Sequence, residues 1–165
     1  MGCLRILVRA IVVVLVLFLV LVVALVATGN HVSAPATQNQ PVVQCDRTDT
    51  GAPGTMAFGT SIDVSSLKLS CVADTFPEAS SFAWHATFST PVTVGALTVI
   101  VARVVGSGTE QTVRTYNEVV SQSDTGSFGA QADPGFLQGL GPGTYAMRIA
   151  AGTDVLAQGT FSVTP

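Results

Sequence analysis

The hydrophobic and polar positions of the chain divide it into two unlike parts. Residues 10 to 27 read AIVVVLVLFLVLVVALVA, eighteen apolar residues without a charge. As a helix they would extend for about 27 Å, close to the thickness of the apolar core of a bilayer. From residue 55 onward, short segments alternate between apolar and polar positions and are separated by Gly, Pro, Asp and Ser. This second pattern is typical of an all-β domain.

The apolar segment is predicted to form a transmembrane or signal-anchor helix over residues 10–28. Arg5 and Arg9 precede it, and no Lys or Arg follows it for many residues. The positive-inside rule therefore places residues 1–9 in the cytoplasm and the C-terminal part outside the cell membrane. The apolar run is longer than that of a typical cleaved signal peptide, which favours a retained single-pass anchor.

The residues that follow the apolar segment are predicted to be a polar tether over residues 29–49. The first part of this tether, GNHVSAPATQNQPVVQ, is uncharged, polar and contains proline. A small-residue site ends at Ala36, and signal peptidase could cut there and release a secreted domain. This secreted form is the alternative to the retained anchor. In either case residues 50–165 form the extracytoplasmic domain.

About seven β-strands are predicted in this domain. In the segment FAWHATF, the side chains of Phe82, Trp84, Ala86 and Phe88 would share one face. The predicted strands cover residues 55–59, 67–73, 82–88, 97–105, 111–119, 144–151 and 154–164. The predicted fold is an all-β sandwich preceded by one N-terminal membrane helix.

A single helical turn is predicted in the segment DPGFLQGL. Asp133 is a preferred N-cap residue, and Pro134 suits the first helical position. Phe136, Leu137 and Leu140 would then pack beneath the sandwich.

The charge of the domain limits its partners. The chain has seven basic residues, of which Arg5 and Arg9 precede the apolar segment, so five basic and all ten acidic residues lie beyond it. The exterior part therefore carries a net charge of −5 and has no basic cluster. This balance argues against nucleic acid as a partner.

Two exterior cysteines, Cys45 and Cys71, are predicted to form a disulfide. An oxidising compartment and an even cysteine count favour the bond. Two separate thiols are the alternative. A disulfide that closes a loop of this length would contribute about 3 kcal/mol in the chain-entropy description.

The exterior region resembles an immunoglobulin-like or fibronectin type III-like β-sandwich. Cys71 on an early predicted strand is followed by Trp84 on the next, like the strand B cysteine and strand C tryptophan of that fold. The segment LGPGTYAMRI resembles a tyrosine corner, which implies that the Tyr145 hydroxyl bonds the backbone just upstream. Met147 stands where an antibody-type domain has its second cysteine, so any disulfide of Cys71 would go to Cys45. The resemblance implies an architecture and no activity.

Two Asp-Thr-Gly triplets, beginning at Asp49 and Asp124, match the catalytic triplet of aspartic proteases. Such a protease needs two carboxylates about 3 Å apart that share a proton. Both triplets here follow polar residues rather than the apolar strand that would hold the carboxylate rigidly. We therefore predict that they are turns, and an exported aspartic-type protease is the less favoured alternative.

No metal or cofactor is expected from the sequence. His31 lies in the tether and His85 lies alone on a predicted strand, so neither has the spacing of a zinc or copper site. The sequence also lacks a nucleophile elbow and a phosphate-binding loop.

One predicted strand, residues 97–105, is apolar on both faces. If one face packs in the core, the other consists of Ile100, Ala102 and Val104. Cover from the 120–143 segment, with its Phe128 and Phe136, is the favoured explanation, and a protein-binding face is the alternative. The sequence thus predicts a membrane-anchored extracytoplasmic binding or assembly module without catalytic activity, whose protein partner it does not identify.

Overall fold

The computed structural model describes residues 42–93, 95–120 and 126–165. The predicted N-terminal helix over residues 10–28, the cleavage site at Ala36 and Asp124 lie outside the described residues. Among the residues that are described, no helix is long and apolar enough to cross a membrane.

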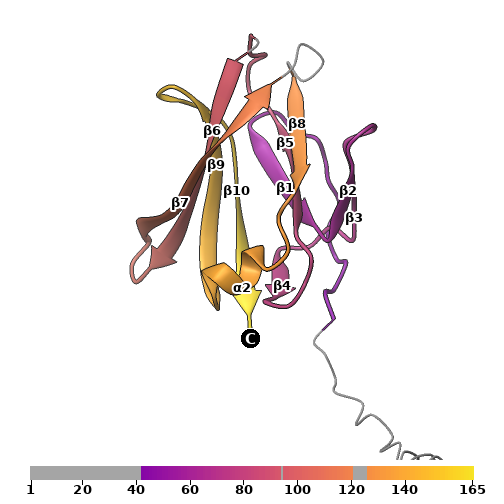
Figure 1. Cartoon of the computed structure of the whole chain (residues 1–165), viewed down its shortest axis with the longest axis vertical. Helices are drawn as coiled ribbons and strands as arrows, with labels where there is room; N and C mark the ends of the chain where they lie inside the picture. The colour runs from indigo at the N-terminus through magenta and orange to yellow at the C-terminus, as the bar shows by residue number, and fades with distance from the viewer. Residues whose placement is uncertain (1–41, 94, 121–125) are drawn as a thin grey trace, which may run out of the picture. The chain divides into compact units, whose positions relative to one another are not determined.

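The described residues form β-strands and one short helix, α2 (Figure 1). The long strands and the helix are β1 (Thr55–Gly59), β5 (Ala83–Thr87), β6 (Gly95–Val105), β7 (Thr109–Val120), β8 (Ser127–Gln131), α2 (Phe136–Leu140), β9 (Gly143–Ala151) and β10 (Asp154–Thr164). The short strands are β2 (Ser61–Asp63), β3 (Lys68–Ser70) and β4 (Thr75–Pro77). The all-β prediction for the domain is confirmed.

The long strands are hydrogen-bonded in the order β7-β6-β9-β10-β1-β5-β8. The order of paired strands passes from one layer to the other between β10 and β1, which meet in a short parallel pairing of Gln158 with Thr55. One layer consists of β7, β6, β9 and β10, and the other consists of β1, β5 and β8 (Figure 1). Among the described strands, β7 and β8 are the two ends of the ladder, so each layer has one of them at its edge.

The strand order is that of an immunoglobulin-like sandwich. β5 pairs with β1 and β8, as strand B pairs with A and E, and β6 pairs with β7 and β9, as C pairs with C′ and F. Trp84 is therefore in the strand B position, and its sequence-based assignment to strand C was wrong. The reason is that β2, β3 and β4 are inserted before β5 and shift the count along the chain.

The prediction of one strand over residues 67–73 was also wrong. Leu67 and Cys71 have left-handed backbone conformations, with φ of 54° and 52°, and they limit β3 to Lys68–Ser70. Within the described part of the chain, this short strand pairs only with β2, as a separate two-stranded hairpin. Cys71 therefore lies in a bend and not on an inward-facing strand position.

The core between the layers is built around Phe82. Its ring lies 4.7–5.6 Å from the ring centroids of four other phenylalanines, which are Phe58, Phe76, Phe136 and Phe161. Trp84, Tyr145 and Met147 are also fully buried. Aromatic pairs at such distances contribute beyond the area they bury, so this cluster is a main source of the domain's stability.

The last part of the predicted tether is held against the domain. Cys45 forms the predicted disulfide with Cys71, and the Arg47 amide donates to the carbonyl of Val72. The side chain of Val43 packs against the core. Residues 42–49 are therefore part of the folded unit. The predicted tether was too long at this end, because it was assigned from local polarity although the predicted disulfide would hold these residues against the domain.

The helix α2 closes the end of the sandwich at which the chain terminates (Figure 1). It begins later than predicted, since Gly135, with φ of 80°, is the N-cap residue and makes no side-chain capping bond. Asp133 instead contributes only its carbonyl, which accepts from the Phe136 amide. Phe136 and Leu137 are buried, as the sequence predicted.

Candidate functional site

The predicted outer face of β6 is largely closed. Ile100 and Val104 are partly buried, and Ala102 is 2% exposed. The strand register explains this burial: Ile100 lies opposite Arg148 on β9, and Val104 lies opposite Glu110 on β7. The ion pair between Arg148 and Glu110 therefore crosses β6 diagonally, over the row in which Ala102 lies.

The aromatic residues expected to cover this face lie elsewhere. Phe136 stacks on Phe82, with ring centroids 5.3 Å apart, and Phe128 packs on Trp84 at 5.5 Å. Both contacts are on the inner side of the sandwich. The prediction that Phe128 and Phe136 cover this face was therefore wrong, and the ion pair between Arg148 and Glu110 lies over it instead.

The first Asp-Thr-Gly triplet forms a turn on the surface. The Asp49 carboxylate accepts a hydrogen bond from the Gly51 amide at 3.0 Å, and Gly51 has a φ of 58°, which glycine adopts without strain. The second oxygen of Asp49 lies 2.5 Å from Nδ1 of His85 on β5. Asp49 thus pairs with a histidine. The second triplet begins at Asp124, which lies outside the described residues.

Tyr145 has the geometry implied by the tyrosine-corner resemblance. Its ring is fully buried at the start of β9. Its hydroxyl lies 2.6 Å from the carbonyl oxygen of Leu140 and 2.8 Å from that of Gly141, and donates to these acceptors. The bond ties the last turn of α2 to the sandwich.

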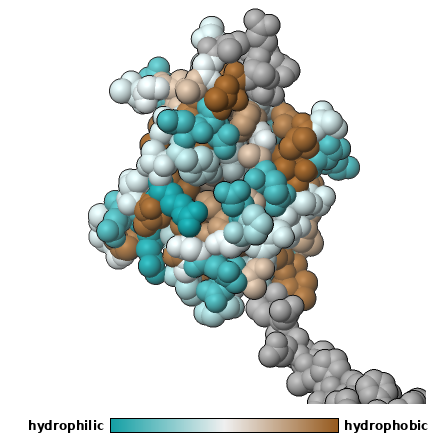
Figure 2. Space-filling model, in the orientation of Figure 1, coloured by the Kyte–Doolittle hydropathy of each residue, from teal (hydrophilic) through white to brown (hydrophobic). Residues whose placement is uncertain are grey.

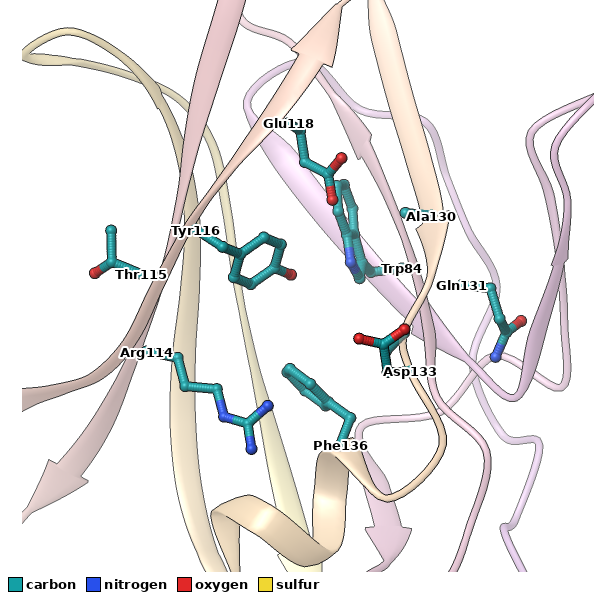
Figure 3. A pocket seen from close by; sticks show the side chains of 10 residues that line it. Trp84, Arg114, Thr115, Tyr116, Glu118, Ala130, Gln131, Asp133 and Phe136 are labelled. Carbon is teal, nitrogen blue, oxygen red and sulfur yellow. The ribbon is translucent and has the colours of Figure 1, made fainter.

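An open cleft lies beside α2, between the edge strands β7 and β8 (Figure 3). It has a volume of 420 Å³. We call it the edge cleft, and its lining includes Trp84, Arg114, Tyr116, Glu118, Gln131, Asp133 and Phe136. These side chains come from β5, β7, β8, α2 and the segment between β8 and α2.

The aromatic residues of the edge cleft form its inner wall. Trp84 is buried in the strand B position, and Tyr116 on β7 also lines the cleft. Phe136, at the start of α2, forms the end of the cleft next to the helix (Figure 3). The Arg114 guanidinium lies 5.0 Å from the centroid of the Phe136 ring, within the range of a cation–π contact.

The side chain of Arg114 is also packed against the helix. Position 139 on α2 is a glycine, and a Cβ there would collide with the Arg114 guanidinium. The missing side chain therefore leaves the space that this guanidinium occupies. Arg114 is held at the α2 end of the cleft by these two contacts.

Burial and charge shift the titration of two groups in the edge cleft. Burial, followed by the charge of Glu118, raises the pKa of Tyr116 to about 12. Burial also raises the pKa of the Glu118 carboxyl above its ordinary value of 4.5. Neither Glu118 nor Asp133 takes part in an ion pair with the described residues. The cleft therefore contains a partly desolvated carboxylate without a compensating cation.

Sequence reasoning did not find this cleft. Arg114, Tyr116 and Glu118 alternate along one predicted strand, which indicated a shared face, but nothing local indicated what that face meets. The pairing of β7 with β6 also has a register shift between Val101 and Ala102, so the two parts of β7 alternate out of phase. Which residues of β7 face the cleft is therefore determined by its pairing with β6. In the described ranges, no group of His, Cys, Asp and Glu is arranged to hold a metal ion.

Comparison with known proteins adds little to this picture. No protein-family model and no curated protein matches the chain. A solved structure of an immunoglobulin-like protein from Pseudomonas aeruginosa matches 67% of this chain and 93% of that chain, with 16% sequence identity and a TM-score of 0.42. The similarity is too weak to indicate a function or a binding residue.

Proposed function

We propose that this protein is a membrane-anchored extracytoplasmic binding or assembly module that contacts its partner through the edge cleft. The observation that carries the proposal is the cleft, which combines an aromatic inner wall with charged groups from separate elements. Binding sites in proteins typically combine an apolar concave surface with a few polar groups. Tyr, Trp and Arg are also the residues that most often dominate the energy of protein–protein contacts.

The rest of this side of the domain supports a small contact site. Figure 2 shows polar and apolar residues mixed over the surface, with the apolar ones in separate groups. A broad apolar patch would favour an obligate interface. A compact cleft with a polar rim fits a partner that inserts one side chain or a short segment.

Glu118 gives further support to a binding role. Its carboxyl is partly desolvated, as the direction of its pKa indicates, and burying a charge in this way disfavours folding. A neutral side chain would serve stability better at this position. Charged groups that lower the stability of the fold in this way are frequent at functional sites.

The exterior location rests on the charge asymmetry around residues 10–28 and is supported by the disulfide between Cys45 and Cys71. The intact mass of the protein extracted from membranes tests the anchor. A chain that retains residues 1–36 is expected. A chain that begins after Ala36 would show that the domain is secreted.

Catalysis is not part of the proposal. Incubation of the full-length protein with an unfolded protein substrate at acid pH should produce no cleavage. Cleavage that disappears in both Asp49→Asn and Asp124→Asn would show instead that the protein is an aspartic-type protease.

Site-specific photocrosslinking in the producing cells tests the binding role of the cleft. A photoreactive residue at Gln131, on the rim of the cleft, should form an adduct with a partner, whereas the same residue at Ile100 should not. Ile100 is the matched control because it belongs to the outer face of β6. An adduct from position 100 alone, or from neither position, would contradict the proposal.

A further inference from the structure

We infer that the partner presents a basic side chain, a lysine ammonium or an arginine guanidinium, to the edge cleft. This inference rests on the proposed function of the cleft and specifies the chemistry of its occupant. In Figure 3 the carboxylate groups of Glu118 and Asp133 and the hydroxyl of Tyr116 point into the same space, with the Trp84 indole beside them. That space has the groups that a cation requires: carboxylate oxygens, a hydroxyl oxygen and aromatic rings.

The charges of the lining favour a cation. Two carboxylates, Glu118 and Asp133, line the cleft together with one guanidinium, that of Arg114. Arg114 is placed over Phe136 and against α2, at the helix end of the cleft. Glu118 lies away from this end and Asp133 lies beside Phe136, and neither carboxylate is in an ion pair with any described residue. An incoming cation would therefore supply the missing counter-charge.

The aromatic residues of the cleft fit the same occupant. The Tyr116 hydroxyl lines the cleft, and its oxygen has lone pairs that can accept a hydrogen bond from an ammonium or guanidinium. The direction of the Glu118 pKa agrees with this arrangement, because burial disfavours its charge and a cation beside it would restore the charged form.

The same charges argue against an acidic occupant. An anionic side chain would meet two carboxylates, Glu118 and Asp133, and one guanidinium, that of Arg114, and this excess of like charge in a partly desolvated site opposes binding. The exterior part of the chain also carries a net charge of −5, which attracts basic partners over a distance and repels acidic ones.

Titration of the full-length protein in nonionic detergent with short capped peptides tests the inference. Three peptides differ only at a central residue, which is lysine, norleucine or glutamate. Trp84 is the single tryptophan of the chain and lines the cleft, so its fluorescence reports occupancy. The lysine peptide should produce a saturable change at millimolar concentrations that weakens as salt is added, and the other two should not.

Variants identify the groups that bind the peptide. Glu118→Gln and Asp133→Asn should each weaken the lysine peptide about tenfold, since each removes a charge-assisted contact. Glu110→Gln, on the same strand but on the opposite face, should leave the affinity unchanged.

Two results would overturn the inference: equal responses to the lysine and norleucine peptides, or no response to the lysine peptide up to tens of millimolar. If either occurs while position 131 still cross-links a partner in cells, the cleft binds something other than a cation and the proposed function stands. If position 131 gives no adduct, the proposed function itself fails.

Discussion

The outer face of β6 and the edge cleft differ in how their charges are arranged. On the outer face, Arg148 and Glu110 pair with each other and cover the small side chain of Ala102. In the edge cleft, Glu118 and Asp133 have no ion-pair partner among the described residues, and Arg114 lies on an aromatic ring instead. The first arrangement closes a surface, whereas the second leaves one available for a ligand.

The pKa directions of two glutamates on β7 express the same difference. The hydrogen bonds from Arg148 lower the pKa of Glu110, whereas burial raises the pKa of Glu118. Glu110 therefore stabilises the fold in its charged form, and Glu118 does not. Substitution of these two carboxylates on the same strand is therefore expected to change the stability of the domain in opposite directions.

The largest effect is expected from the wall of the cleft. Phe136→Ala removes a buried ring that stacks on Phe82 and carries the Arg114 guanidinium. It should lower the free energy of unfolding by about 3–5 kcal/mol. Ile100→Ala, a truncation on the outer face of β6, is the control and should have a smaller effect. Urea denaturation measures both, and equal losses would show that the cleft wall is no better packed than the outer face.

The next effect tests whether the outer face of β6 is closed. Ala102→Leu adds a larger side chain beneath the ion pair between Arg148 and Glu110. Such overpacking should destabilise the domain by about 1–3 kcal/mol. An open binding face would accept the leucine at no loss. An unchanged denaturation midpoint would therefore restore the outer face as a candidate interface.

A smaller effect is expected from the corner that fixes α2. Tyr145→Phe keeps the buried ring and removes the hydroxyl that bonds the end of the helix. The expected loss is about 1 kcal/mol. Because α2 supplies Phe136, the lysine peptide should also bind more weakly, whereas the pairing of Arg148 with Glu110 should not change. A midpoint equal to that of the wild type would mean that the hydroxyl does not hold the helix.

The smallest effects are expected from Glu110→Gln and Glu118→Gln, which should change the free energy of unfolding in opposite directions. A lowered pKa means that Glu110 stabilises the fold above its ordinary pKa of 4.5 and loses this contribution as the pH falls, so Glu110→Gln should destabilise the domain at neutral pH only. A raised pKa means that ionisation of Glu118 disfavours the fold, so the domain loses stability as the pH rises through the folded-state pKa of this carboxyl. Glu118→Gln should therefore stabilise the domain at neutral pH, by at most about 0.5 kcal/mol, and have no effect at low pH.

Denaturation of both variants across this pH range provides the measurement. Destabilisation by Glu118→Gln at neutral pH would contradict the assignment of its carboxyl as an uncompensated charge.

The sequence predicted the fold more fully than the site. Alternation located the strands that contain Trp84 and Met147, and a long apolar run between turn residues located the strand that contains Val99. The short strands β2 and β4 have three residues each, too few for such a pattern, and the small residues of β8, SFGAQ, give little contrast between its two faces. The left-handed backbone of Cys71, which ends β3, had no local signal either.

The site could not be predicted because it forms only when distant elements meet. Tyr116 and Trp84 come from different layers, and Phe136 comes from α2, whose last turn is bonded to Tyr145. The outer face of β6 was a candidate binding face in the sequence because this strand is apolar on both faces. The ion pair of Arg148 and Glu110 covers this face and joins strands that are far apart in the sequence. Local sequence patterns therefore could not predict it.

The most direct test of the account measures cross-linking from position 131 in the producing cells, in Glu118→Gln and in Glu110→Gln. Glu118→Gln is expected to reduce the adduct strongly, although it makes the domain slightly more stable, and Glu110→Gln is expected to leave the adduct intact. The reverse result, or an adduct insensitive to both changes, would contradict the claim that the edge cleft binds a partner through its unpaired carboxylate.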